Sequence, residues 1–219
     1  MCEKEGNSLP KRTFNRLDDD KKERVMRAAI EEFQAHGFEN AKIEGIAQNA
    51  GVAKGSIYQY FDDKKELFLY SVTWAIENFM KMIDRQTPLK DMDVYEYFLS
   101  GSRERFEMIR KEPLLISFAI DFSQGKYGSL AVEINRELKR VGEEYELKLI
   151  ANGKKRGTIR DDLDDKILLL FFQGVTEKFN MEILAMAKNF ESELSEEQFN
   201  ETESLVKSMV TLLKQGMER

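Results

Sequence analysis

The sequence contains very little cysteine and histidine: Cys2 and His36 are the single residues of each type among 219 positions. A lone cysteine forms no disulfide within the chain, and structural zinc sites almost always need four cysteine or histidine ligands. A Ser-His-Asp or Cys-His catalyst would have to use His36. This residue precedes Gly37, where the pattern indicates the end of a helix. A cation is favourable at that end of a helix, so a structural role explains His36 without catalysis. We therefore expect no metal site and no catalytic residues.

The sequence also lacks long apolar runs. The longest spans residues 167–172, whereas a membrane span needs roughly 18 residues or more. The first residues carry no apolar stretch like that of a secretion signal. Proline (3) and glycine (13) are too scarce for a collagen-like or low-complexity chain, and 42% hydrophobic residues can bury a core. We expect a folded, cytoplasmic protein that does not contact membranes.

An excess of positive charge is absent as well. The net charge is −6, and the first 70 residues hold 12 Lys and Arg against 13 Asp and Glu. No overall electric field therefore attracts this chain to nucleic acid. Any DNA binding has to depend on a few cations placed where the DNA backbone would lie.

Helical periodicity is what the sequence does contain. Val25, Ala29 and Phe33 recur at intervals of four, and similar apolar stripes follow along the chain, without an alternating strand pattern of any length. This predicts an all-α fold of about nine helices. The expected helices cover approximately residues 18–37, 43–49, 53–61, 63–85, 94–109, 114–122, 130–149 with Asn152-Gly153 as its end, 166–188 and 199–216.

The chain divides into three predicted segments. Residues 1–17 are polar, contain Pro10 and show no periodicity, which predicts a flexible arm. Residues 18–70 hold the shortest helices, two of which flank a glycine-containing turn as in a helix-turn-helix, and are predicted to form a DNA-binding domain. Residues 71–219 hold long apolar helices and are rich in aromatic residues and methionine, and are predicted to form a larger domain for effector binding and dimerisation. The cations of the arm that could touch a DNA backbone are Lys11, Arg12 and Arg16.

Two short predicted helices flank the turn Ala50-Gly51-Val52, the arrangement of a helix-turn-helix, whose second helix enters the major groove. Ile57 and Phe61 lie four apart and are expected to face inward. Gly55 has no side chain, so a phosphate or a base edge could approach its backbone. Packing of the tyrosines against neighbouring helices is the alternative. The residues left for the outer face are Lys54, Ser56, Tyr58, Gln59 and Tyr60.

About 45 residues of this region strongly resemble the TetR family of bacterial transcriptional regulators, which is more specific than a helix-turn-helix alone. The resemblance implies an all-helical regulator that binds operator DNA and is released by a small molecule. It is carried by Ile30-x-x-Phe33-x-x-x-Gly37-Phe38 and by Ile46-Ala47-x-x-Ala50-Gly51-Val52-Ala53-Lys54-Gly55-Ser56-Ile57-Tyr58-x-Tyr60-Phe61-x-x-Lys64-x-x-Leu67.

The resemblance also implies roles for single residues. The positions that match phosphate contacts of the family are Lys54, Tyr58, Tyr60 and Lys64. The positions that match the reading of base edges are Val52, Ala53, Ser56 and Gln59, and glutamine can pair with adenine through two hydrogen bonds.

The sequence departs from the family pattern at two places. Family members often have threonine at the start of the second helix, where this chain has Asn40-Ala41-Lys42. Asn40 is therefore expected to cap that helix, and Lys42 to take the phosphate contact. Family members also often have serine or threonine where Ala53 stands, so a hydroxyl contact to DNA is lacking.

A homodimer is expected because one such module makes few base contacts. Two modules about 34–36 Å apart would reach successive major grooves of a near-palindromic operator. The helix at 166–188 is apolar almost all round and the helix at 199–216 has a broad apolar face, so two from each subunit could form a four-helix bundle. The alternative is that both helices form the core of a single subunit.

The second predicted domain is rich in aromatic residues and methionine, which line many small-molecule pockets. The candidate effector-binding residues are Phe98, Ser102, Phe118, Phe122, Phe172 and Thr176, with a plain core role as the alternative. The prediction is a ligand-responsive repressor without a cofactor and without enzyme activity. A helical protein-binding adaptor that lacks DNA binding and an enzyme on a helical scaffold are the alternatives.

Overall fold

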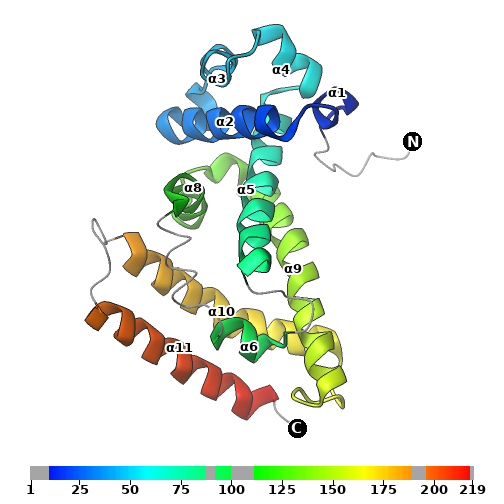
Figure 1. Ribbon diagram of the computed structural model, residues 1–219, viewed down its shortest axis with the longest axis vertical. Coiled ribbons are helices and arrows are strands. Elements are labelled where there is room, and N and C mark those ends of the chain that lie inside the picture. Colours follow the sequence, from blue (N-terminus) through cyan, green and yellow to red (C-terminus); the bar gives the residue numbers. More distant parts are fainter. Residues whose placement is uncertain (1–9, 87–91, 100–110, 189–195, 218–219) are drawn as a thin grey trace. The chain divides into compact units, whose positions relative to one another are not determined.

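The computed structural model describes residues 10–86, 92–99, 111–188 and 196–217, and this part of the chain contains helices and no strands, which confirms the all-α prediction (Figure 1). No described helix is long and apolar enough to cross a membrane. The helices are α1 (Arg12–Asn15), α2 (Asp19–Asn40), α3 (Ile43–Ala50), α4 (Lys54–Tyr60), α5 (Lys64–Gln86), α6 (Val94–Leu99), α8 (Pro113–Ser123), α9 (Ala131–Arg156), α10 (Asp165–Lys188) and α11 (Glu196–Met217), with a 3-10 turn at Gly128–Leu130.

The chain forms two compact units. The first comprises Met1–Asn78 with Leu114–Leu138, and the second comprises Phe79–Pro113 with Lys139–Arg219. Helices α5 and α9 contribute residues to both units. The predicted boundary between two domains at residue 70 stays a prediction.

The first unit is built around aromatic side chains. The ring of Phe68 on α5 lies 4.9 Å from that of Phe33 on α2, 6.1 Å from that of Phe118 on α8 and 4.9 Å from that of Tyr127. Edge and tilted ring contacts of this kind are favourable beyond the apolar area that they bury. Residues 114–138 therefore share one core with the helices of the predicted DNA-binding domain.

The ends of α2 and α5 follow from local sequence. The Asp18 carboxylate accepts a hydrogen bond from the Lys21 amide (2.8 Å) and begins α2. Gly37 interrupts that helix with φ 70° and ψ 171°, a backbone conformation that essentially only glycine adopts. Asp63 accepts from the Glu66 amide (2.8 Å), and the Glu66 carboxylate accepts from the Asp62 amide, so a reciprocal pair of the capping-box kind begins α5.

The predicted flexible arm is wrong for the residues that the structure describes. Arg12–Asn15 form α1, and Phe14 is completely buried. Its ring lies 5.0 Å from that of Phe61, 5.7 Å from that of Tyr60 and 5.5 Å from that of Tyr70. Burial of one aromatic side chain holds a segment that has no periodicity of its own. The first nine residues lie outside the described part.

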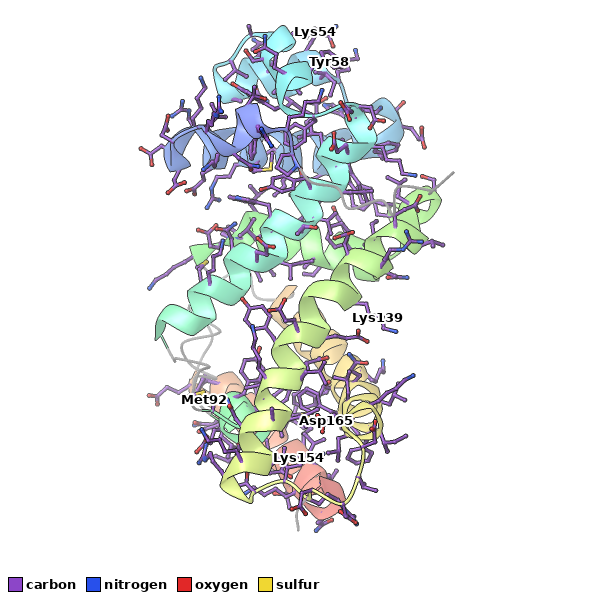
Figure 2. The ribbon with its side chains drawn as sticks, turned by 90° about the vertical axis from the view of Figure 1, so that its right-hand side faces the viewer. Lys54, Tyr58, Met92, Lys139, Lys154 and Asp165 are labelled. Carbon is purple, nitrogen blue, oxygen red and sulfur yellow. The ribbon has the colours of Figure 1, made fainter. Side chains whose placement is uncertain are left out.

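The second unit packs α6, α10, α11 and the C-terminal part of α9 around a separate core that includes Phe98, Ile150 and Leu213. Helix α11 lies against α6 and α10 (Figure 1). The loop from α9 to α10 is fixed by Lys154, which pairs with Asp165 at 2.5 Å and donates to the Leu163 carbonyl at 2.7 Å (Figure 2).

The end predicted for the long helix at Asn152-Gly153 is wrong. Helix α9 continues to Arg156, and Gly157 ends it with φ 73°. Gly153 serves close packing instead, because a Cβ atom there would lie 2.5 Å from Cδ1 of the buried Ile159.

Candidate nucleic-acid interface

Helices α3 and α4 form the predicted helix-turn-helix in the first unit. Gly51 ends α3 in the left-handed conformation, with φ 68° and ψ 37°, which confirms the glycine-dependent turn. The Val52 amide donates to the Ala47 carbonyl across this turn (2.9 Å). Ile57 and Phe61 are each 1% exposed, so the inner face of α4 is the expected one.

The opposite face of α4 is open. Tyr58 is 47% exposed, and Figure 2 shows it with Lys54 on the same short helix. Ser56 and Val52 are half-buried. Other exposed residues of the turn and of α4 are Ala53, Gly55 and Gln59. The surface has the polar and aromatic character expected for reading DNA, and contact with DNA stays a prediction.

The expectation that Tyr60 faces outward is wrong. The side chain is 5% exposed, and its ring meets that of Phe14 edge-on at 5.7 Å. Positions 57, 60 and 61 share one helical face, so Tyr60 lies beside Ile57 and contributes to the packing of α4 against α1. The alternative of tyrosine packing therefore holds for Tyr60 and fails for Tyr58.

Lys54, at the start of α4, pairs with Glu44 of α3, and both side chains are largely exposed. The hydrogen bond from Lys54 lowers the pKa of the Glu44 carboxyl, and the same bond raises the pKa of Lys54. A carboxyl with a lowered pKa is ionised at neutral pH, and the pair is lost only as the pH falls through that lowered value. A DNA phosphate therefore has to compete with Glu44 for this cation.

Lys64 and Lys42 lie at the ends of neighbouring helices. The Lys64 ammonium donates to the carbonyls of Glu39 (2.9 Å) and Ala41 (3.2 Å) and lies 4.9 Å from the centre of the Phe38 ring. It therefore holds the end of α2, and a phosphate would be an additional ligand. The Lys42 side chain is exposed, as a phosphate contact requires.

The start of α3 is capped by Glu32, which the sequence interpretation missed. The predicted cap by Asn40 is wrong, because Asn40 is the last residue of α2 and the N-cap position of α3 is held by Lys42, whose side chain makes no capping hydrogen bond. The buried Glu32 carboxylate reaches across from α2 and accepts the Lys42 amide at 2.8 Å. A Cβ atom at Gly45 would lie 2.6 Å from this carboxylate. Glycine is unfavourable inside a helix, so Gly45 in this short helix was the sequence feature that could have indicated a close neighbour.

The arm cations differ in their surroundings. Lys11 forms an ion pair with Asp62 at 2.6 Å. Arg12 and Arg16 lie exposed on and directly after α1, where a phosphate contact stays a prediction.

The structure places the candidate effector residues in both units. Phe98 and Phe172 lie in the second unit, with ring centres 5.7 Å apart, and the buried Thr176 donates to the Phe172 carbonyl at 2.8 Å. Phe118 and Phe122 lie in the first unit, with ring centres 4.5 Å apart. Ser102 lies outside the described residues. Both aromatic pairs fit a core role as well as ligand binding, so the effector site stays a prediction.

Helices α10 and α11 expose several large apolar side chains in the second unit. Leu212 of α11 is 64% exposed and Leu170 of α10 is 56% exposed. The remaining members of this apolar surface are Ile167, Phe171 and Leu205. Large apolar side chains exposed on two helices that pack against each other are typical of surfaces that a partner covers.

Comparison with known proteins gives consistent matches. The family model for bacterial regulatory proteins of the tetR family matches residues 25–70. The biofilm operon icaADBC HTH-type negative transcriptional regulator IcaR of Staphylococcus aureus is 24% identical over 137 residues, which cover 58% of this chain and 73% of IcaR.

Solved structures share the fold. A TetR family transcriptional regulator from Chloroflexus aurantiacus matches with a TM-score of 0.54 and 24% identity, over 96% of this chain and 99% of that one. The transcriptional regulator FadR from Bacillus subtilis, in complex with stearoyl-CoA, matches with a TM-score of 0.61 and 20% identity, over 89% and 98% of the two chains.

Proposed function

We propose a specific regulatory role on the premise that this chain belongs to the TetR family of bacterial transcriptional regulators. Members of that family are DNA-binding regulators, and so is this chain. The proposed role is that of a repressor, which binds a near-palindromic operator as a homodimer and leaves it when a small molecule binds.

The observation that carries the proposal is the division of α4 into two faces. Ile57 and Phe61 are buried, whereas Lys54, Tyr58 and Gln59 are exposed beside a tight turn. A recognition helix needs this arrangement, because the inner face fixes the helix while the outer face reaches base edges and phosphates. Gln59 has the side chain that can read adenine, and Lys54 supplies a cation.

Repression and release by a ligand are supported by the relatives. IcaR is named a negative regulator, and FadR was solved with stearoyl-CoA, a molecule with a long apolar chain. The buried core of the second unit includes the aromatic side chains Phe98 and Phe172, a kind of side chain that often holds apolar ligands. Release then requires that the effector bind the DNA-free form more tightly than the DNA-bound form.

Dimer formation is supported by the apolar surface of α10 and α11. Its five exposed side chains lie on two helices that pack against each other. A second copy related by a twofold axis would present the same surface, which is the arrangement of a four-helix bundle.

A salt titration of DNA binding with single variants tests the role of α4. Lys54→Ala should weaken binding to all sequences alike and reduce the salt slope by about one. Gln59→Ala should instead relax preference at particular base pairs, at a cost of about 1–3 kcal/mol. If Gln59→Ala left both affinity and preference unchanged, the proposed reading face would be wrong.

Native mass spectrometry of protein purified from its own host tests the effector. We expect an added mass from a bound small molecule, and we expect that molecule to weaken operator binding when it is supplied to the ligand-free protein. A bound molecule that leaves operator affinity unchanged would contradict release by that effector.

A further inference from the structure

The recognition helix is too short to hold itself together. Helix α4 has seven residues, and isolated helices of fewer than about 12–15 residues are marginal in water. The last four carbonyl groups of any helix have no partner within the helix. In α4 these carbonyls belong to residues 57–60, which include Tyr58 and Gln59 of the outer face, so their partners help to determine whether that face keeps its shape.

Residues at the start of α1 supply partners for four successive carbonyls. The Lys11 ammonium donates to the carbonyls of Tyr58 (2.9 Å) and Phe61 (3.3 Å), and the Lys11 amide donates to that of Tyr60 (2.9 Å). The Thr13 hydroxyl donates to the Gln59 carbonyl. A cation at this end of a helix is also favoured by the helix dipole.

Helix α1 is itself fixed in place. The completely buried ring of Phe14 packs on Phe61 and Tyr70, and Lys11 pairs with Asp62 directly after the recognition helix. The segment is therefore anchored by an apolar side chain and directs two hydrogen-bond donors at α4.

We propose that Lys11 and Thr13 are positioning residues for DNA recognition, which act by holding the C-terminal turn of α4. The inference rests on the proposed function, since it assigns α4 to DNA reading. Without these donors the last turn frays, the fraction of molecules with an ordered reading face falls, and the apparent dissociation constant rises in proportion. The sequence alone suggested a phosphate contact for Lys11, and the two roles differ in a measurable way.

The salt dependence of DNA binding separates the two roles. The probe is a DNA duplex that the wild-type protein selects from a random-sequence pool. For a positioning role, Thr13→Val should weaken binding by about fivefold, because it loses one hydrogen bond. Lys11→Met should weaken binding by at least as much, because it loses two hydrogen bonds and an ion pair. The slope of log K against log salt should stay unchanged in both variants. Thr13→Ser keeps the hydroxyl and should restore wild-type affinity.

Two results would overturn the proposal. A phosphate contact predicts that Lys11→Met lowers the slope by about 0.9, whereas Thr13→Val leaves affinity unchanged. Wild-type affinity for both Lys11→Met and Thr13→Val would exclude a positioning role as well. Lys54→Ala serves as the comparison in which a lower slope is expected.

Amide hydrogen exchange in the free protein gives a readout that needs no DNA. Thr13→Val should speed exchange of the amides in α4, while the amides of α2 keep their wild-type rates and show that the unit remains folded. Unchanged exchange in α4 would contradict the proposal. If the wild-type protein selected no duplex, the proposed function would fail, and the exchange rates would still decide whether α1 holds α4.

Discussion

If the chain dimerises through α10 and α11 as proposed, Leu212→Glu should convert the dimer to a monomer. Leu212 is 64% exposed on α11, and burial of a whole leucine side chain contributes about 2 kcal/mol, so the exposed part contributes about 1.3 kcal/mol. A twofold interface contains the residue twice, which gives about 2.5 kcal/mol, or roughly 70-fold in the dissociation constant. Two carboxylates placed in an apolar interface add a desolvation penalty, so we expect at least about 100-fold weaker dimerisation.

Sedimentation velocity over a range of protein concentrations measures this change. Val132→Glu is the matched control, because Val132 is 72% exposed and belongs to the first unit, whereas the apolar surface of α10 and α11 belongs to the second. The control should remain dimeric, and circular dichroism should show the same helix content for all three proteins. A dimer of unchanged affinity in Leu212→Glu, or the same loss in Val132→Glu, would refute the assignment of this surface.

Three further changes test the packing and the charges. Gly153→Ala should lower the free energy of unfolding, measured by urea denaturation, by about 1–3 kcal/mol through overpacking. Gly142→Ala is the control in the same helix and should raise that free energy by about 0.5–1 kcal/mol, because the space around its Cβ position is open. Glu32→Ala should cost about 2 kcal/mol in the same assay, because the partly buried amide at the start of α3 loses its charged acceptor, and an unchanged midpoint would contradict this cap. Glu44→Gln should release Lys54 and strengthen DNA binding roughly two- to fivefold, and weaker binding would show that the ion pair assists recognition.

Much of the fold is predictable because its determinants are local in sequence. The stripe of Val25, Ala29 and Phe33 gives α2, the capping box at Asp63 gives the start of α5, and Gly51 gives the turn before the recognition helix. Each depends on residues within one or two turns of each other, which is the range that periodicity and capping patterns cover.

The features that sequence reasoning missed depend on contacts between segments. Phe14 is a single apolar residue in a polar stretch, and its burial follows only from the aromatic residues around position 60. Glu32 accepts the amide of Lys42, ten residues later in the chain and on the other side of the end of α2. Tyr60 was predictable: it lies three residues after Ile57, on the same buried face, and the outward assignment ignored that spacing.

The effector site was the least predictable part of the candidate function. Aromatic side chains form cores and pockets alike, so composition does not separate these two roles. The structure divides the candidates between two cores, as shown by Phe118 in one and Phe172 in the other. Which candidate residues belong to the same core depends on how distant segments pack, and no local sequence pattern reports that packing.

Selection of DNA duplexes from a random-sequence pool tests the central claim most directly. A dimer that reads DNA with two copies of α4 should enrich an inverted repeat, whose half-site centres lie about 10 base pairs, or 34–36 Å, apart or a multiple of that distance. Enrichment of no sequence, or of a single half-site bound by a monomer, would contradict the account.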